Sequence, residues 1–225
     1  MFTFRIDAQN MIQAGLNAGN DMAPWYKGAA PSGYAAWRWV SHSNNDAFYT
    51  VLNQINSAEF RHFTVDGQPA GHDNFNYVVT TWEHRFTEDG RFHTKTEGYF
   101  MWERNAVVGG TPSIGPPQVF GGGGGSGALI PGLSEAYGVL NYTMYGFTKR
   151  DYLCFRNEWW RDQTGFRATF PGNYTSHTIG WSHQFNDLVM IRPEIGYYRN
   201  WNEPAFDLGT KNGIWIYGFD FTVRF

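Results

Sequence analysis

Basic and acidic residues stand two positions apart in several segments whose other residues are largely apolar or aromatic. In an extended strand, side chains two positions apart point to the same side, so these charges share one face. Mixed charges that face a water-filled interior orient polar solutes and set a weak ion preference. Alternatively, the charges only neutralise one another and stiffen the wall that surrounds such an interior. Both roles stay open for each residue. The residues predicted to face inward are Arg38, Lys95, Glu97, Arg156, Glu158, Arg192, Glu194 and Asp220.

Residues that act in hydrolytic enzymes are present, but their spacing does not indicate an active site. The candidates His177, His183, Ser182 and Asp162 lie at spacings that 7 His and 20 acidic residues produce by chance. The two histidines stand too far apart on one strand for a compact metal site. The five glycines at 121–125 lack the Lys with Ser or Thr that follows in a phosphate-binding loop. We therefore expect no enzyme activity, no metal and no cofactor.

The last eleven residues, WIYGFDFTVRF, show the clearest strand pattern in the chain. Every second position is apolar or aromatic, in the order Trp215, Tyr217, Phe219, Phe221, Val223 and Phe225. The positions between them hold Ile216, Gly218, Asp220, Thr222 and Arg224. The two faces of such a strand meet two different solvents, because side chains alternate between them. Ending in an aromatic residue, it looks like the closing strand of a bacterial outer-membrane barrel.

The composition of the whole chain fits the same interpretation. Aromatic residues make up 19% of the 225 positions and charged residues only 16%, yet the mean hydropathy is −0.47. No segment approaches the roughly 20 apolar residues of a membrane-spanning helix. A membrane protein of this composition has to be a barrel, in which only alternate side chains meet lipid. The net charge of −3 gives no indication of nucleic-acid binding, and the single cysteine, Cys154, excludes an internal disulfide.

Period-two patterns predict about ten antiparallel strands whose connections alternate between short and long. The predicted strands are 1–17, 33–42, 47–57, 74–86, 91–103, 135–148, 151–162, 175–185, 188–200 and 212–225. The predicted long loops are 17–32, 58–73, 104–134, 162–173 and 201–211, and the loop near 104–134 contains the glycine run. Tight turns at one end and long loops at the other are typical of outer-membrane barrels, whose turns face the periplasm.

We therefore predict an all-β fold in which residues 1–225 form a single transmembrane β-barrel domain. This domain is either complete or the C-terminal part of a larger barrel. Residues 1–20 carry Arg5, Asp7 and Gln9 where a secretory signal needs an apolar core. The expectation is that a signal peptide and N-terminal strands are missing from this sequence.

Aromatic residues near the strand ends are expected to form girdles at the two membrane–water interfaces. The predicted girdle comprises Trp102, Trp159, Trp181, Trp215, Tyr217 and Phe225. Stacking on carbohydrate is the alternative role for the loop residues Trp25, Tyr26 and Trp201.

Several segments resemble the β-barrel porin-2 family, also described as OmpL-like. They are FRNEWWRDQTGFRATFPGNYTSHTIGWSHQF, IRPEIGYYRNWNEPAFD, NAGNDMAPW and GYAAWRW. The resemblance is densest from Leu153 to Phe225, and it implies a porin of the Gram-negative outer membrane that carries small solutes. Arg156, Glu158, Arg192 and Glu194 fall on the strand motifs of the family. Members of the family are usually longer, so the lumen width of this chain stays open.

The expected function is passive diffusion of ions or small hydrophilic solutes through a polar lumen in the outer membrane. The expected partners are the lipid bilayer, the solutes, and the barrel-assembly machinery, which would recognise the terminal strand ending at Phe225. No nucleic-acid partner is expected. Because about eight strands leave no open channel, a non-conducting barrel with a structural or loop-displaying, adhesive role is the alternative. A soluble sugar-binding sandwich is the third class, and it would stay dispersed without detergent.

Overall fold

The computed structural model describes residues 1–18, 25, 31–53, 61–65, 68–72, 76–109 and 128–224, with backbone alone for 61–65 and 68–72. Its elements are the strands β1 (Phe2–Arg5), β2 (Asn10–Asn17), β3 (Ser32–Val40), β4 (Asp46–Asn53), β5 (Arg61–Val65), β6 (Gln68–His72), β7 (Asn76–Arg85), β8 (Phe92–Arg104), β9 (Leu133–Gly146), β10 (Asp151–Asp162), β11 (Gly172–Gln184), β12 (Val189–Asn200) and β13 (Gly213–Val223). Within these residues there is no helix long and apolar enough to cross a membrane.

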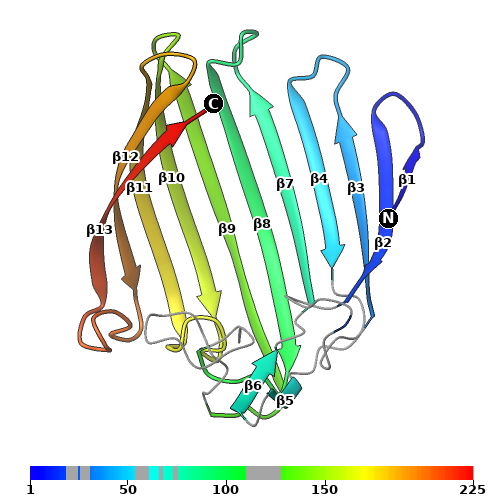
Figure 1. Ribbon diagram of the computed structural model, residues 1–225, viewed down its shortest axis with the longest axis vertical. Coiled ribbons are helices and arrows are strands. Elements are labelled where there is room, and N and C mark those ends of the chain that lie inside the picture. The colour runs from blue at the N-terminus through cyan, green and yellow to red at the C-terminus, as the bar shows by residue number, and fades with distance from the viewer. Residues whose placement is uncertain are drawn as a thin grey trace.

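Eleven of the strands form one continuous antiparallel sheet, in the order β1-β2-β3-β4-β7-β8-β9-β10-β11-β12-β13. Each strand pairs with the next along the chain, apart from β5 and β6, which form a separate hairpin between β4 and β7. The sheet curves strongly, and β1 and β13 stand at its two edges (Figure 1). The predicted all-β antiparallel fold is confirmed, with eleven sheet strands rather than about ten.

The predicted first strand, 1–17, is two strands joined by a tight turn. The carboxylate of Asp7 causes the break, because its Oδ1 accepts the backbone N–H groups of Gln9 and Asn10, both at 2.7 Å. The hydrogen bond from the Gln9 amide is the largest cause that lowers the pKa of Asp7. An Asx turn of this kind reverses the chain without Gly or Pro. The predicted loop 58–73 likewise contains the hairpin β5–β6.

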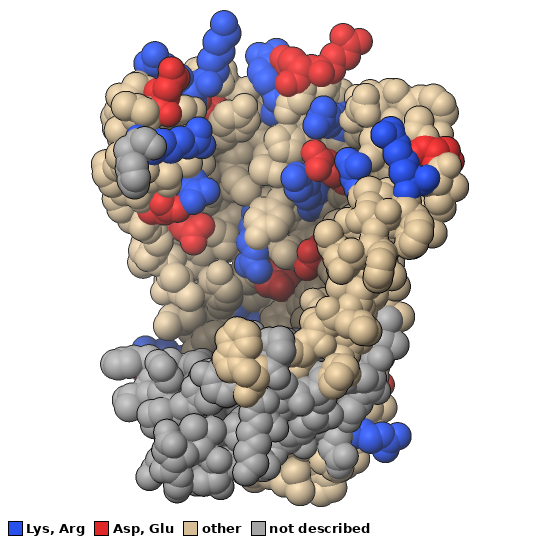
Figure 2. Space-filling model, turned by 45° about the vertical axis from the view of Figure 1, so that its right-hand side comes forward, with Lys and Arg blue, Asp and Glu red and all other residues tan. Residues whose placement is uncertain are grey.

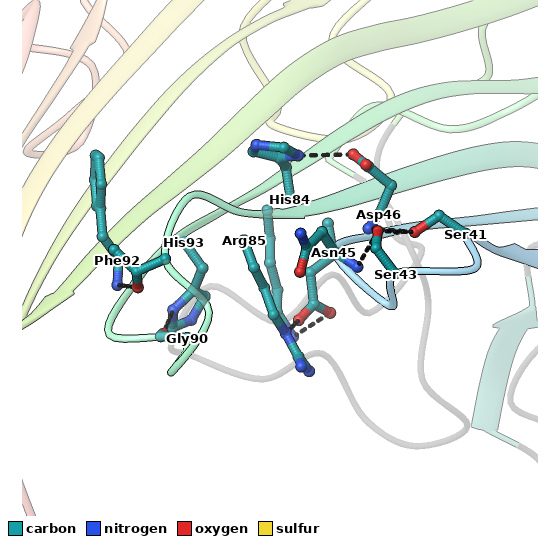
Figure 3. A network of polar contacts seen from close by, with 12 residues as sticks. Ser41, Ser43, Asn45, Asp46, His84, Arg85, Gly90, Phe92 and His93 are labelled. Carbon is teal, nitrogen blue, oxygen red and sulfur yellow. Dashed lines mark hydrogen bonds and ion pairs between the residues drawn. The ribbon is translucent and has the colours of Figure 1, made fainter.

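The connections are sorted by length as the sequence predicted. The short turns β1–β2, β3–β4, β7–β8, β9–β10 and β11–β12 all lie at the upper end of Figure 1, and the strand ends that border the longer connections lie at the lower end. Side chains fix the short turns. At the β3–β4 turn the hydroxyl of Ser41 accepts the Asp46 amide at 3.0 Å, and that of Ser43 accepts the Asn45 amide at 3.3 Å (Figure 3).

One face of the sheet is concave and polar, and the other is convex and largely apolar. The phenol of Tyr99 on β8 reaches the carboxylate of Glu158 on β10 at 3.2 Å, across the strand β9 that separates them. Gly138 of β9 makes this possible, because a Cβ there would lie 2.7 Å from the Tyr99 hydroxyl and 2.5 Å from the Trp160 Cβ. On the opposite face of β13, Tyr217 is 75% exposed and Phe219 is 69% exposed.

A small core lies on the concave side near the long connections. Phe166 in the connection after β10 is buried against Ala106 and Ala136. This connection is held by Asp162, whose carboxylate accepts the backbone N–H groups of Gly165, Arg167 and Ala168 at 2.8 to 2.9 Å. The connection therefore folds inward over the concave wall.

Candidate functional site

Charged side chains on the concave face lie in two adjacent rows of the strand register. The first row runs through Arg38, Tyr49, Thr81, Glu97, Leu140, Glu158, Ser176 and Tyr198. The second row runs through Glu83, Lys95, Tyr142, Arg156, Thr178 and Gly196. We call the six Arg, Lys and Glu residues of these rows the charged band; they are Arg38, Glu83, Lys95, Glu97, Arg156 and Glu158. Figure 2 shows basic and acidic side chains gathered around a hollow.

Arg156 and Glu158 form the most closely connected part of the band. The Arg156 Nη2 lies 2.6 Å from the Glu158 Oε2, and its Nη1 donates to the Ser176 hydroxyl at 2.9 Å. That hydroxyl donates in turn to Glu158 at 3.1 Å, and Tyr99 donates to the other carboxylate oxygen. The ring of Tyr142 lies beside the guanidinium, with 6.0 Å between the Arg156 Cζ and the ring centroid. The pair is thus neutralised and held in one geometry.

The remaining members of the band are less constrained. Lys95 lies 3.2 Å from Glu83 of the neighbouring strand. Arg38 and Glu97 share a register row, and within the described part of the chain neither has an ion-pair partner. Sequence analysis did not single out Glu83. Glu83 lies two positions after the polar Thr81, which indicates a polar face. Tyr77 and Val79 on the same face are aromatic and apolar, and they obscured this pattern.

The other three predicted inward residues form a second cluster on β12 and β13. The guanidinium of Arg192 donates to the carboxylate of Asp220 directly across the strand pair. Glu194 is paired in register with Gly218, and a Cβ at Gly218 would lie 2.8 Å from the Glu194 Cγ. Gly218 therefore leaves the space that the glutamate side chain occupies.

Two adjoining cavities connect this cluster with the charged band. A cavity of about 810 Å³ lies against Arg192, Glu194 and Asp220. A second cavity of about 290 Å³ lies against Arg156, Tyr142 and Tyr198. Cys154, Gly180 and Glu194 line both cavities. All eight predicted inward residues therefore lie on one concave surface, and Arg156, Arg192, Glu194 and Asp220 border these two cavities.

The convex face carries the predicted girdle residues that the structure describes. Trp159, Trp181, Trp215 and Tyr217 are between 38% and 75% exposed there, and Trp102 packs against Phe100 at 5.5 Å between ring centroids. Phe225 and Tyr26 lie outside the described residues. The loop residues Trp25 and Trp201 are exposed, and Trp201 lies under the guanidinium of Arg199.

A side-chain arrangement that sequence analysis missed occurs twice at the turn end of the convex face. The Asp151 Oδ1 accepts the Trp181 indole N–H at 3.1 Å and lies 2.7 Å from the His183 Nδ1. Asp46 holds Trp82 and His84 in the same way, at 3.1 and 2.7 Å (Figure 3 shows the Asp46–His84 contact). The repeated Trp-x-His spacing is visible in the sequence, but the aspartates are about 30 residues or more away.

The structure places the four earlier hydrolytic candidates in different surroundings. Asp162 anchors backbone amides, His183 and His177 point to the convex face with Asp151 and Asn157, and Ser182 faces the opposite side. In the part of the chain that the structure describes, no group of three or more His, Cys, Asp or Glu side chains is arranged to hold a metal ion.

Comparison with known proteins identifies a similar fold. The chain is similar to the outer membrane channel DcaP of Acinetobacter baumannii, known from a crystal structure, with a TM-score of 0.57 and 9% sequence identity. The match covers 98% of this chain and 61% of the DcaP chain. No family model matches, and no curated protein matches. The all-antiparallel fold is thus similar to that of this channel, whereas the narrower resemblance to the β-barrel porin-2 family stays a prediction.

Proposed function

We propose that the chain forms the wall of an outer-membrane channel through which ions and small hydrophilic solutes diffuse passively. The observation that carries the proposal is the separation of the two faces. Charged residues from β3, β7, β8 and β10 lie in two adjacent rows on the concave side, while the convex side of β13 is an exposed aromatic row. Charges are tolerated on the inner face of a membrane barrel and are costly on its lipid face.

The two sheet edges bear on the size of the lumen. Open edges are not stable in the hydrocarbon region, so β1 and β13 have to pair with each other or with further strands. The chain spans 61% of the length of the DcaP chain. The lumen width of this chain and the solutes that pass through it are therefore proposed rather than observed. We also propose that the chain belongs to the β-barrel porin-2 family. The barrel-assembly machinery would recognise it through the terminal strand.

A non-conducting barrel is the second candidate, and the connection after β10 is the observation that favours it. This connection folds onto the concave side, where Phe166 is 1% exposed. The connection narrows the concave space in front of β8, β9 and β10. A cavity of about 450 Å³ lined by Tyr99, Trp160 and Tyr174 lies beside it. A barrel narrowed in this way would display its loops without conducting.

Single-channel recording in a planar bilayer separates the two candidates. The chain, refolded in detergent, is expected to insert and to give steady steps of conductance. Insertion without conductance, shown by a heat-modifiable folded band in the same vesicles, would favour the non-conducting barrel. A chain that stays dispersed without detergent and does not insert would contradict both.

A further inference from the structure

Two arginines stand near the loop end of the convex face. Arg161 on β10 lies in register with Asn173 of β11, and Arg199 on β12 lies in register with Thr175 of the same strand. Trp201 follows the end of β12, and its backbone N–H donates to the carbonyl of Asn173 at 2.9 Å. We call these five residues the outer arginine cluster.

The cluster is arranged around an exposed indole. It belongs to the convex face, because Thr175 is also the register partner of the exposed girdle residue Trp159. The Trp201 indole N–H donates to the Thr175 hydroxyl at 3.0 Å, and the Arg199 Cζ lies 4.0 Å from the ring centroid of Trp201. Trp201 is nevertheless 56% exposed, so its ring offers a surface to a ligand.

The two arginines carry charges that the described part of the chain does not neutralise. Both are half-buried, and among the described residues neither forms an ion pair. Glu135 on the neighbouring strand β9 instead accepts the side-chain amide of Gln163 at 3.1 Å. The Nε of Arg199 is buried and has no hydrogen-bond acceptor among the described residues. Because an unpaired, partly buried guanidinium is costly, an anionic ligand is a suitable partner for the cluster.

The two ends of the convex face differ in charge. At the turn end the strands carry the carboxylates Asp46 and Asp151, whereas Arg104 on β8 adds a third, exposed arginine at the loop end. In an outer-membrane barrel the long loops lie on the external side and the short turns on the periplasmic side. The external leaflet of that membrane is built of a glycolipid whose sugar headgroup carries phosphate groups. The charge of the loop end is therefore complementary to the lipid on its side.

From these observations we propose that the outer arginine cluster binds the phosphorylated sugar headgroup of a glycolipid in the external leaflet. The inference rests on the proposed membrane function. Arg161 and Arg199 stand on alternate strands, and each planar guanidinium matches the oxygens of a phosphate group. Trp201 supplies an aromatic surface for stacking on a sugar ring. The side-chain amides of Asn173 and Asn202, 3.1 Å apart, keep further donors and acceptors for sugar hydroxyls.

Lipid binding to the folded full chain in detergent, measured by native mass spectrometry, tests the proposal. The probes are bisphosphorylated lipid A, the same lipid A without its phosphates, and phosphatidylglycerol, which offers phosphate without a sugar ring. The parent chain is expected to retain bisphosphorylated lipid A in preference to the other two, and an excess of inorganic phosphate should not displace it. Arg161→Gln with Arg199→Gln is expected to weaken lipid A binding roughly 30-fold, the effect of two basic residues at an anionic lipid surface.

Two matched variants separate the cluster from overall charge. Lys149→Gln with Arg150→Gln removes two charges from the exposed β9–β10 turn and should leave the affinity for lipid A unchanged. Arg161→Lys with Arg199→Lys keeps both charges and should bind lipid A more tightly than the glutamine pair does. A heat-modifiable band shows that each variant is folded.

The sugar contact has its own variant. Trp201→Ala should lower the affinity for lipid A more than the affinity for phosphatidylglycerol. Trp215→Ala is the matched control, because this tryptophan of β13 is 59% exposed on the same face. It should leave the preference for lipid A over phosphatidylglycerol unchanged.

Three results would overturn the proposal. The first is unchanged lipid A binding by the folded glutamine pair. The second is equal binding of lipid A with and without its phosphates. The third is displacement of lipid A by phosphatidylglycerol at equal concentration or by inorganic phosphate, which would show that the sugar is not recognised. A chain that alkaline carbonate extracts from vesicles would instead contradict the proposed membrane function, so the two failures are distinguishable.

Discussion

Arg156 is the most highly coordinated cation of the charged band, with contacts to Glu158, Ser176 and Tyr142. If the band borders an ion pathway, removing this charge exposes the carboxylate of Glu158 to passing ions. We predict that Arg156→Gln raises the cation-to-anion permeability ratio about twofold, the effect of one unit charge roughly 8 Å away across water when salt screens it over a Debye length of about 8 Å. The reversal potential in a salt gradient measures this ratio.

The controls for this prediction keep or relocate the charge. Arg156→Lys retains it and should leave the ratio close to that of the parent chain. Lys149→Gln removes an equal charge from the exposed β9–β10 turn, outside the lumen, and should have no effect. An equal shift from Lys149→Gln would show that the ratio responds to overall charge rather than to the band.

Gly138 is the residue whose size is most restricted on the concave wall. An added Cβ would lie 2.5 Å from the Trp160 Cβ and 2.7 Å from the Trp159 carbonyl. Gly138→Ala is expected to lower the free energy of unfolding by about 1–3 kcal/mol, the usual cost of overpacking. Urea unfolding in lipid vesicles, followed by tryptophan fluorescence, gives the value. Gly98→Ala is the matched control, because no atom lies within 4 Å of its added Cβ; equal stability losses in both variants would contradict the steric explanation.

Among the elements, the β1–β2 and β7–β8 turns are held by the carboxylates of Asp7 and Asp89. In the β7–β8 turn, the hydrogen bond from the Arg91 amide is the main cause that lowers the pKa of Asp89. When folding lowers the pKa of a carboxyl group, that group stabilises the turn at pH values above its unfolded-state pKa. This stabilisation is lost as the pH falls through the pKa of the folded state. We predict that protection of the Arg91 amide from hydrogen exchange falls between about pH 5 and pH 2.

The control for the turn prediction is Asp89→Asn. This variant should show low protection of the Arg91 amide at every pH, because the ionised acceptor is absent. A pH dependence that persists in Asp89→Asn would assign the effect to another group.

The inward connection after β10 depends on one side chain, Asp162. The residue is fully buried, and its carboxylate accepts the amides of Gly165, Arg167 and Ala168. In Asp162→Asn, an N–H group would face two of these donors, with an expected loss of roughly 2–3 kcal/mol. The connection should become sensitive to added protease in folded vesicles. Asp187→Asn, the same change at an exposed position in the β11–β12 turn, should leave the connection resistant; cleavage in both variants would contradict the anchoring role.

Most strands could be predicted from the sequence because alternation of apolar and polar residues is a local property. The strands β8, β10 and β12 differ from their predicted bounds by one residue at most. The division of 1–17 into β1 and β2 could not, since the turn depends on a hydrogen-bonding geometry that Asp7 adopts without Gly or Pro. The two faces of β9 are almost equally apolar in sequence, so alternation alone does not assign them. In the structure its convex face carries Asn141 and Thr143.

Part of the candidate site could also be predicted from the sequence, and part could not. Which face each charge occupies follows from parity, and the structure places all eight predicted residues on the concave side. Their alignment into two rows depends on the register between strands, which turn and loop lengths set. The contacts of Asp46 with Trp82 and of Asp151 with Trp181 depend on the same register across long connections.

In the whole molecule, the concave side of the sheet is expected to face water and the convex side to face lipid. Substituted-cysteine labelling along β10 tests this most directly. Single cysteines are placed in turn at positions 154 to 160 of the membrane-inserted protein, and a charged, water-soluble thiol reagent is applied. The parent chain supplies Cys154, and Cys154→Ser is the background for the other six positions. Labelling is expected at Cys154, Arg156, Glu158 and Trp160, and protection at Phe155, Asn157 and Trp159. Uniform labelling, uniform protection, or labelling of the second set in place of the first would contradict the account.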